Sequence, residues 1–430
     1  MGILLKNATF IDYRTSNFVE TDVFVEEGVG GKITLLSGKK DFVLPEGTKV
    51  VDCRGMYVTK ALACGHHHVY SALSRGMPAS PKPMNNFYQV LEYLWWTLDK
   101  CLDRDMIEAS ALVTALSCAY NGVTFVIDHH ASPFAVEGSL QTIATAFEKV
   151  GVSHLLCYEV TDRDGHDIAL KGLAETGDFM QKNQGLVGLH AAFTVEDETL
   201  KLAVDLAAKL NSGIHVHVAE DKYDQDYSIE KYGKRVVNRL HEAGALSFPK
   251  TILGHCIHLD TAERELIQKS PVYVVQNIES NLNNKVGQFN SEGLGKNLML
   301  GTDGMHSDMV RSAQNTFFAG KNYDSFGFDE PYRRLRNVHN YVESNGFTGD
   351  GDNNLIVLDY PSPSPFNGDN FLGHFYFGME SKYVKHVISD GKMIVADKKI
   401  QTVNEAEILA FAKEQAQRLW DRINDRYSKF

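Results

Sequence analysis

The stretch MYVTKALACGHHHVYS (residues 56–71) passes from an apolar, strand-like run into three consecutive histidines. In an extended chain alternate side chains face the same way, so His66 and His68 point together while His67 points to the opposite side. Two imidazoles spaced two residues apart form a natural metal chelate, and this arrangement predicts a metal site at a strand end. The alternative is a solvent-facing loop in which the histidines bind nothing.

Seven further apolar runs of strand type follow, and most gaps between them hold amphipathic stretches of helical length. This alternation predicts an α/β fold, a (β/α)8 TIM barrel in which side chains at the carboxyl ends of the strands build the site. An open, doubly wound sheet is the alternative, and the lack of a glycine-rich phosphate loop disfavours it. The seven later runs span residues 122–128, 151–158, 185–190, 213–218, 250–255, 271–275 and 297–303.

Histidine or aspartate stands at most of the predicted strand ends, which packing alone does not explain because buried imidazoles and carboxylates need partners. In GIHVHVAED (residues 213–221) the alternation places His215 and His217 on one face, with Glu220 beyond the strand. Asp303 ends the run NLMLGTD. Three imidazoles and one carboxylate suit Zn²⁺, with Fe²⁺ as the alternative, and leave a position for water. The predicted ligands of one divalent ion are His66, His68, His217 and Asp303.

Each of these residues also has a purely structural interpretation. His215 and His217 could be core histidines whose hydrogen bonds are satisfied, and Glu220 could be a surface acid. Asp303 could be the N-cap of the next helix. His255, which ends the run KTILGH, could orient a reacting hydroxide or be a satisfied core histidine.

Both ends of the chain are rich in short strand-like runs separated by turns. Residues 353–360 read as a buried strand, and residues 384–395 carry the Asp390-Gly391 pair that is typical of a tight hairpin. Two β-rich ends predict one small β-sandwich domain built from both, and helical periodicity after residue 404 predicts a C-terminal helix. The expected organisation is residues 1–56 and 351–403 for the small β-domain, 57–350 for the barrel and 404–430 for the helix.

The composition excludes several classes of partner. The 430-residue chain has a formal net charge of −12, which disfavours nucleic acid and anionic membrane surfaces. Its six cysteines are scattered without a CxxC pair, as is typical of reduced thiols in the cytoplasm. The N-terminal residues lack the apolar core of a signal peptide. We therefore expect a cytoplasmic enzyme that acts on a small molecule and has no nucleic-acid or membrane partner. We also expect a homo-oligomer, namely a dimer.

Four motifs together resemble the amidohydrolase superfamily: HxH at His66 and His68, HVAE at 217–220, GHCIHL at 254–259 and GTDG at 301–304. The resemblance runs almost end to end and is closest to the metal-dependent aminohydrolase and deaminase branch, which includes guanine deaminase, adenosine-type deaminases and triazine chlorohydrolases. Stretches such as CYEVTDRDG and GHFYFG look closer still to the SsnA-type aminohydrolases. The resemblance implies the ligand set named above, Glu220 as proton shuttle, His255 as the hydroxide-orienting residue and His190 as a substrate contact.

The chain departs from the family pattern at three places. Residues 59–62 read TKAL where the family usually enters the strand with Pro-Gly, and residues 276–281 read QNIESN where it usually reads HNPxSN. Residues 346–355 read GFTGDGDNNL and lack the usual Gly-rich turn that ends in Ala-Asp. None of these departures touches a predicted ligand. His190 stands where two-metal members carry a bridging lysine, so one metal ion per chain is expected.

The implied function is hydrolytic deamination of a purine-, pterin- or triazine-like heterocycle by a metal-bound hydroxide, with Asp303 accepting the water proton and Glu220 protonating the ring. The alternatives are a ring-amide hydrolase of purine or hydantoin breakdown, a chlorohydrolase, and a non-catalytic ligand-binding barrel. The aromatic run FYQVLEYLWW (residues 87–96) could form a lid, a dimer surface or ordinary core. The candidate substrate contacts are His190, Tyr70, Arg75, His130, Asp162, Arg163 and His306.

Overall fold

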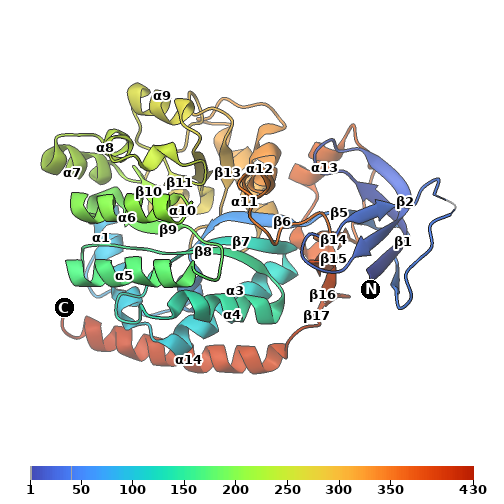
Figure 1. Cartoon of the computed structure of the whole chain (residues 1–430), viewed down its shortest axis with the longest axis horizontal. Helices are drawn as coiled ribbons and strands as arrows, with labels where there is room; N and C mark the ends of the chain where they lie inside the picture. Colours follow the sequence, from blue (N-terminus) through green and yellow to red (C-terminus); the bar gives the residue numbers. More distant parts are fainter. Residues whose placement is uncertain (1, 40) are drawn as a thin grey trace.

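The computed structural model describes residues 2–39 and 41–430, and the larger part of it contains eight parallel strands that alternate with helices (Figure 1). All eight strands expected from the sequence are present and in the expected order. Strands β6, β7 and β8 form one parallel sheet, and β9 to β13 form a second one in chain order. The strands are β6 (Leu62–His67), β7 (Val123–His130), β8 (Ser153–Tyr158), β9 (Val187–Ala191), β10 (Ile214–Val218), β11 (Ile252–His255), β12 (Tyr273–Gln276) and β13 (Leu298–Leu300).

Isolated parallel bridges link the edges of these two sheets. Val160, just beyond β8, pairs with Leu189 of β9, and His67 of β6 pairs with Asp303 just beyond β13. The strands read as continuous apolar runs because both of their faces are covered, and every residue of β7 and β10 is buried. The histidines and aspartates at the carboxyl ends of the strands therefore gather on one side of the molecule.

The helices of this larger part turn apolar stripes toward the strands. In α6 (Asp197–Lys209), Leu200, Ala203 and Ala207 are buried at helical spacing. The other long helices of the alternation are α3 (Arg104–Tyr120), α4 (Ser139–Val150), α5 (His166–Phe179), α7 (Lys222–Tyr232), α9 (Thr261–Lys269), α11 (Met309–Gly320) and α12 (Glu330–Ser344).

Both ends of the chain meet in one nine-stranded sheet of the described residues, at the right of Figure 1. Strand β5 (Tyr57–Lys60) pairs in parallel with β1 (Gly2–Ile11) and antiparallel with β14 (Leu355–Leu358). Early and late segments are thus direct neighbours, while a sandwich of two layers stays a prediction. Because β5 belongs to this sheet, the sheet extends past the expected boundary at residue 57. Its other strands are β2 (Phe18–Glu26), β3 (Ile33–Leu35), β4 (Lys49–Asp52), β15 (Val384–Ser389), β16 (Lys392–Ala396) and β17 (Lys399–Ile400).

The hairpin predicted at Asp390-Gly391 is confirmed between β15 and β16, which pair antiparallel. Both turn residues adopt left-handed backbone angles, with φ of 46° and 72°. Positive φ at both central residues is the requirement of the turn type that matches the twist of a hairpin, and Asp-Gly meets it at low cost.

The C-terminal helix α14 (Glu405–Tyr427) runs along the bottom of Figure 1 and packs against α3. Asn404 caps its first turn. The indole Nε1 of Trp420 donates a hydrogen bond to the carbonyl of Leu73 over 2.9 Å, and Arg422 contacts Asp103 over 2.7 Å. Since Leu73 lies in the short helix that follows β6, α14 supports the segment that leads away from the three histidines.

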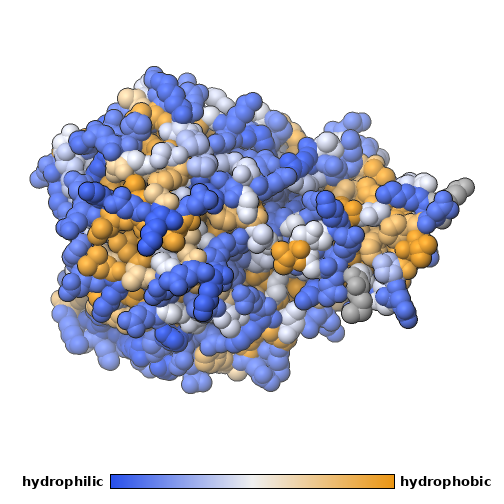
Figure 2. Space-filling model, viewed as in Figure 1, coloured by the Kyte–Doolittle hydropathy of each residue, from blue (hydrophilic) through white to orange (hydrophobic). Residues whose placement is uncertain are grey.

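The surface in Figure 2 is mostly hydrophilic, with apolar patches that include part of the small sheet at the right. Exposed apolar side chains of the N-terminal segment include Val29, Val43 and Val50. In the part of the chain that the structure describes, no helix is both long and apolar enough to cross a membrane.

A buried ionic cluster lies where the small sheet meets the larger part. Lys60 Nζ is 2.9 Å from Asp350 Oδ1, and His339 Nδ1 is 2.6 Å from Asp350 Oδ2, with all three side chains at most 5% exposed. Burial opposes ionisation of Asp350, but the charges of His339 and Lys60 outweigh it and lower the pKa of this carboxyl to about 2.

We expect Asp350→Asn to lower the free energy of unfolding by about 3–5 kcal/mol at neutral pH, because it leaves buried Lys60 without its partner. The pKa of Asp350 is lower in the folded chain, so its contribution is complete above the unfolded pKa of about 4 and is lost as the pH falls toward 2. Urea unfolding between pH 7 and 2 measures both effects. Exposed Asp352→Asn is the control, and equal stability of the two variants would contradict the prediction.

Candidate metal centre and active site

Three imidazoles converge at the carboxyl ends of β6 and β10. The Nε2 atom of His217 lies 3.1 Å from that of His68 and 3.3 Å from that of His66. All three side chains are buried, and burial holds the pKa of His66 and of His217 well below its usual range. These two rings are therefore neutral at physiological pH, which is the form in which imidazole binds a metal.

In two of these histidines the second ring nitrogen, Nδ1, also has a partner. His68 Nδ1 donates to the backbone carbonyl of His129 over 2.7 Å, and His66 Nδ1 lies 2.9 Å from Nε2 of His215. Contacts of this kind set the orientation and tautomer of a ligand ring and leave its Nε2 for the metal. His215 lies on the same face of β10 as His217. Its Nε2 contacts His66 Nδ1, however, and so does not join the three converging nitrogens.

Asp303 reaches the imidazoles because β13 passes very close to β6. A Cβ atom at Gly301 would lie 2.8 Å from the carbonyl oxygen of His66, so glycine is needed there. The N–H of Asp303 donates to the same carbonyl over 3.1 Å, and its left-handed φ of 53° turns Oδ1 to 3.3 Å from His68 Nε2. Burial opposes ionisation of Asp303, but His68 and His255 outweigh it and lower its pKa to about 2.

This donor set fits a divalent metal ion. Three nitrogens that face one another across 3.1–3.3 Å cannot all carry protons, whereas one cation between them satisfies all three together with the Asp303 carboxylate. Imidazole and carboxylate donors suit Zn²⁺ and Fe²⁺. His129 lies within the same cluster, and neither of its buried ring nitrogens has a hydrogen-bond partner among the described residues. The N-cap of α11 is Asp308, so Asp303 does not have the capping role that was its structural alternative.

Glu220 and His255 meet beside this cluster. His255, at the end of β11, accepts a hydrogen bond at Nδ1 from the Asn281 amide over 2.8 Å, so the ring proton resides on Nε2. That nitrogen lies 3.4 Å from Glu220 Oε2 and 3.5 Å from Asp303 Oδ2. Burial lowers the pKa of His255 to about 4. Burial, reinforced by the Asp303 charge, raises the pKa of Glu220 well above its usual range, so Glu220 can hold a proton near neutral pH.

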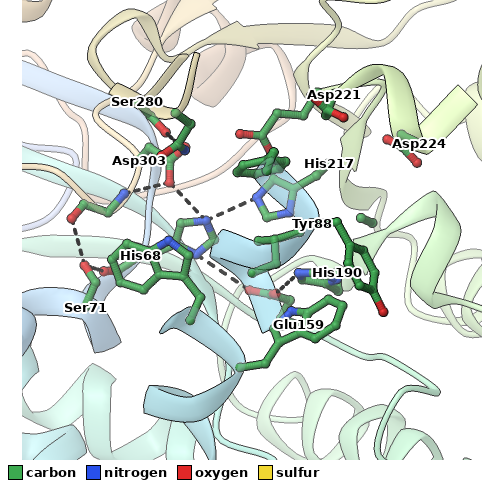
Figure 3. A pocket seen from close by; sticks show the side chains of 18 of the residues that line it. His68, Ser71, Tyr88, Glu159, His190, His217, Asp221, Asp224, Ser280 and Asp303 are labelled. Atoms are coloured by element: carbon green, nitrogen blue, oxygen red, sulfur yellow. Dashed lines mark hydrogen bonds and ion pairs between the residues drawn. The ribbon is translucent and has the colours of Figure 1, made fainter. Parts of the chain in front are cut away.

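A pocket opens in front of these groups, and both polar and aromatic side chains line it (Figure 3). The aromatic run that begins at Phe87 supplies several of the lining residues and includes a π-helical turn at Leu91–Trp95, a rare form that is often found at functional sites. The Tyr88 ring contacts the rings of Trp96 and Tyr223 at centroid distances of 5.5 and 4.8 Å. The aromatic lining residues are Tyr70, Phe87, Tyr88, Trp95, Trp96, Phe193 and Tyr223.

The structure brings most of the predicted catalytic residues and ligands to this pocket. His66 and His255 lie directly behind the lining, in contact with His217 and with Glu220 respectively. The predicted residues that line the pocket are His68, Tyr70, Arg163, His190, His217, Glu220 and Asp303.

Two predicted substrate contacts from the first two strands lie outside the lining. Arg75 follows the short helix after β6 and is exposed on the surface. His130 is buried beneath the pocket and lies 2.9 Å from the hydroxyl of Ser132. His130 does lie at the end of β7, as expected. The adjacent His129, however, is the residue that faces the ligand cluster.

Two further predicted contacts are occupied by other partners. The carboxylate of Asp162 accepts a hydrogen bond from the Thr199 hydroxyl over 2.8 Å and so ties the loop after β8 to the first turn of α6. His306 Nε2 lies 3.3 Å from Glu279 Oε1, away from the pocket lining. Both residues therefore stabilise loops around the site.

Sequence reasoning missed Glu159 as a site residue. It follows Tyr158 at the end of β8, lines the pocket, and lies 3.2 Å from His190 Nε2. His190 ends one predicted strand and Glu159 directly follows another, so their positions in the sequence carry the same signal. His129 was not among the predicted ligands either, and its place in the histidine cluster depends on which way the last residues of β7 turn.

The model described as "Amidohydrolase family" matches residues 57–327, more than half of the chain, and the chain therefore belongs to the amidohydrolase family. This confirms the resemblance that the four motifs carry. The 5-methylthioadenosine/S-adenosylhomocysteine deaminase of Thermoanaerobacter pseudethanolicus is 24% identical, over 98% of this chain and 100% of its own. The 5'-deoxyadenosine deaminase of Methanopyrus kandleri is 27% identical, over 94% and 92% respectively.

The same fold is found in a solved structure of an adenosine deaminase from Xanthomonas campestris with bound zinc. It aligns with a TM-score of 0.83 at 18% identity, over 97% of this chain and 98% of its own. The likeness shows that the two proteins share a fold along nearly their whole length.

Proposed function

We propose that the protein is a metal-dependent aminohydrolase that deaminates a purine-, pterin- or triazine-like heterocycle. The observation that carries the proposal is the meeting of Glu220, His255 and Asp303 beside three converging imidazoles at the floor of one pocket. His66, His68, His217 and Asp303 would hold the ion, and we propose Zn²⁺. When bound, such an ion would lower the pKa of a water molecule and so supply a nucleophile near neutral pH.

The chain's own residues would divide the proton transfers among them. Ionised Asp303 accepts a proton from the attacking water, while Glu220, whose pKa is raised by burial, donates its proton to the heterocycle. The Nε2–H of neutral His255 faces both carboxyl groups and can hold the attacking oxygen in place. The new C–O bond forms first and makes the ring carbon tetrahedral. The C–N bond then breaks as the amine takes the proton from Asp303 and leaves as ammonia, while the hydroxyl proton returns to Glu220 and the product carbonyl forms.

The finer architecture belongs to the same proposal. The bridges at Val160 and His67 support closure of the two parallel sheets into a (β/α)8 barrel. The small domain would comprise the segments up to β5 and from β14 to β17, folded as a two-layer sandwich, with α14 as a separate helix on the barrel. We further propose a homodimer, and a cytoplasmic location that suits six cysteines that are all buried and free.

The experiment is a screen for released ammonia. Metal-loaded protein is incubated with purines, pterins and triazines that carry an exocyclic amine, and ammonia is measured by a coupled assay. We expect at least one of these classes to release stoichiometric ammonia with the ring intact. A ring-opened acid or chloride in place of ammonia would contradict deamination and favour ring-amide hydrolysis or dechlorination.

A further inference from the structure

We propose that Glu159 determines which substrates the pocket accepts, by taking a hydrogen bond from an N–H or O–H group of a neutral or cationic heterocycle, and that heterocycles bearing a carboxylate or phosphate are excluded. This inference rests on the proposed function and names the substrate class of the same site. It concerns binding, so it can be tested separately from turnover.

Glu159 is held in the pocket wall with one of its two carboxyl oxygens unpartnered among the described residues. Its backbone N–H donates to the carbonyl of His130 over 2.7 Å, which fixes the residue at the end of β8. The side chain is buried, and within residues 2–39 and 41–430 its Oε2 atom has no hydrogen-bond partner. The imidazoles of His190, His68 and His129 lie 3.2, 3.6 and 3.7 Å from its oxygens. An ionised carboxylate that is buried without a donor is costly, and burial therefore raises the pKa of Glu159 well above its usual range. A ligand N–H or O–H would remove that cost and favour the ionised form.

Away from the proposed metal centre, the described residues of the pocket offer an anionic substrate no unpaired arginine or lysine. Among the described residues that line it, Arg163 is the one arginine or lysine. Its guanidinium is already paired with Asp99 and lies 3.1 Å from Asp164 Oδ2, while it also stacks over the Trp96 ring at 5.0 Å. A substrate carboxylate or phosphate that lies beside Arg163, away from the metal centre, would be buried without a partner, which is strongly unfavourable.

A second carboxyl group at the pocket has the same need for a donor. Asp224 lines the pocket and is 2% exposed, and its Oδ1 atom finds no hydrogen-bond partner in the described chain. Aromatic rings line the same pocket, among them Tyr88 and Trp96. A flat ring with donor groups on its edge and no negative charge matches this combination of surfaces.

The test uses two matched pairs of ligands that differ in one negative group: pterin with pterin-6-carboxylate, and adenosine with adenosine 5'-monophosphate. Affinity for the metal-loaded protein is measured by calorimetry, or as kcat/KM where a ligand is turned over. The wild type is compared with Glu159→Gln and with Glu175→Gln. Glu175 is another buried carboxylate, which binds the backbone N–H groups of Gly138 and Leu140 outside the pocket.

We expect the neutral member of at least one pair to bind the wild type at least tenfold more tightly than its anionic partner. Glu159→Gln should weaken the neutral member by about 10- to 100-fold, the range of a hydrogen bond to a charged group, and Glu175→Gln should leave the preference intact. Preference for the anionic members, or no change in Glu159→Gln, would overturn the inference. Failure of all four ligands to bind would overturn it as well.

Two further outcomes separate this inference from the proposed function. If neutral ligands bind with the expected dependence on Glu159 and no heterocycle releases ammonia, the inference stands and the proposed function fails. Glu159, His190 and His217 also lie close enough to share a cation. If elemental analysis finds a metal equivalent in the wild type that Glu159→Gln loses, Glu159 is a metal ligand and the inference is wrong.

Discussion

Replacing Glu220 with Gln is expected to lower kcat by about 10²–10⁴-fold, the range that a general acid–base step supplies, while the metal content stays at the wild-type level. Gln has nearly the same shape but cannot donate a carboxylic proton. In the structure Glu220 faces His255 and Asp303 and lines the pocket, yet it is not one of the converging nitrogens or their carboxylate partner. The change therefore removes a proton and leaves the ligand set in place.

The measurement is steady-state ammonia release with the best substrate of the screen, combined with elemental analysis of the same samples. Glu175→Gln serves as the matched control, because it changes a buried carboxyl to an amide outside the pocket. Turnover of Glu220→Gln within a few-fold of the wild type would rule out the proton-shuttle role. Loss of metal together with activity would instead assign Glu220 to the metal centre.

His217→Ala is expected to reduce bound metal from about one equivalent per chain to a small fraction of that, and to lower kcat/KM by more than about 100-fold. Changes behind the ligands of a metal site already cost about 10- to 100-fold in affinity or activity, and loss of a ligand costs more. The Nε2 atom of His217 lies within 3.3 Å of the Nε2 atoms of both His66 and His68, so the change removes a donor from the middle of the ligand set.

His67→Ala is the matched control for this prediction, because it removes an imidazole from the same motif. The His67 side chain points away from the three nitrogens and lies 3.2 Å from the hydroxyl of Ser307. Metal per folded chain should therefore stay near one equivalent in His67→Ala. Equal metal in His217→Ala and the wild type, or two equivalents in the wild type, would contradict the single centre.

The eight strands and the paired histidines could be predicted because both follow from local rules. A strand that is covered on both faces must be apolar throughout, so each run was visible in the sequence without knowledge of its neighbours. The alternation of side chains alone placed His66 and His68 on one side and His67 on the other. Alternation alone could not place Asp303 beside the histidines. Its approach depends on Gly301, which lets the end of β13 lie against β6.

The positions of loop residues could not be predicted in this way, because side-chain directions along a loop follow no repeating pattern. Arg75 and His306 stand near strand ends in the sequence, yet one turns to solvent and the other toward Glu279. Arg163 does line the pocket, but its pairing with Asp99 was invisible because the two residues come from different loops. The aromatic run after Phe87 was open to several interpretations, and only its packing against Tyr223 shows that it faces the pocket.

The pairing of β5 with β14 also constrains how the protein is made on the ribosome. Strand β14, the partner of β5, is synthesised about 300 residues later. The first strands therefore leave the ribosome long before β14 can pair with them. Closing so long a loop is also slow. During translation those strands present open, apolar edges to the cell. A message truncated before residue 355 would yield chains that hold every metal-binding histidine and still cannot complete the small domain, and such chains are expected to aggregate.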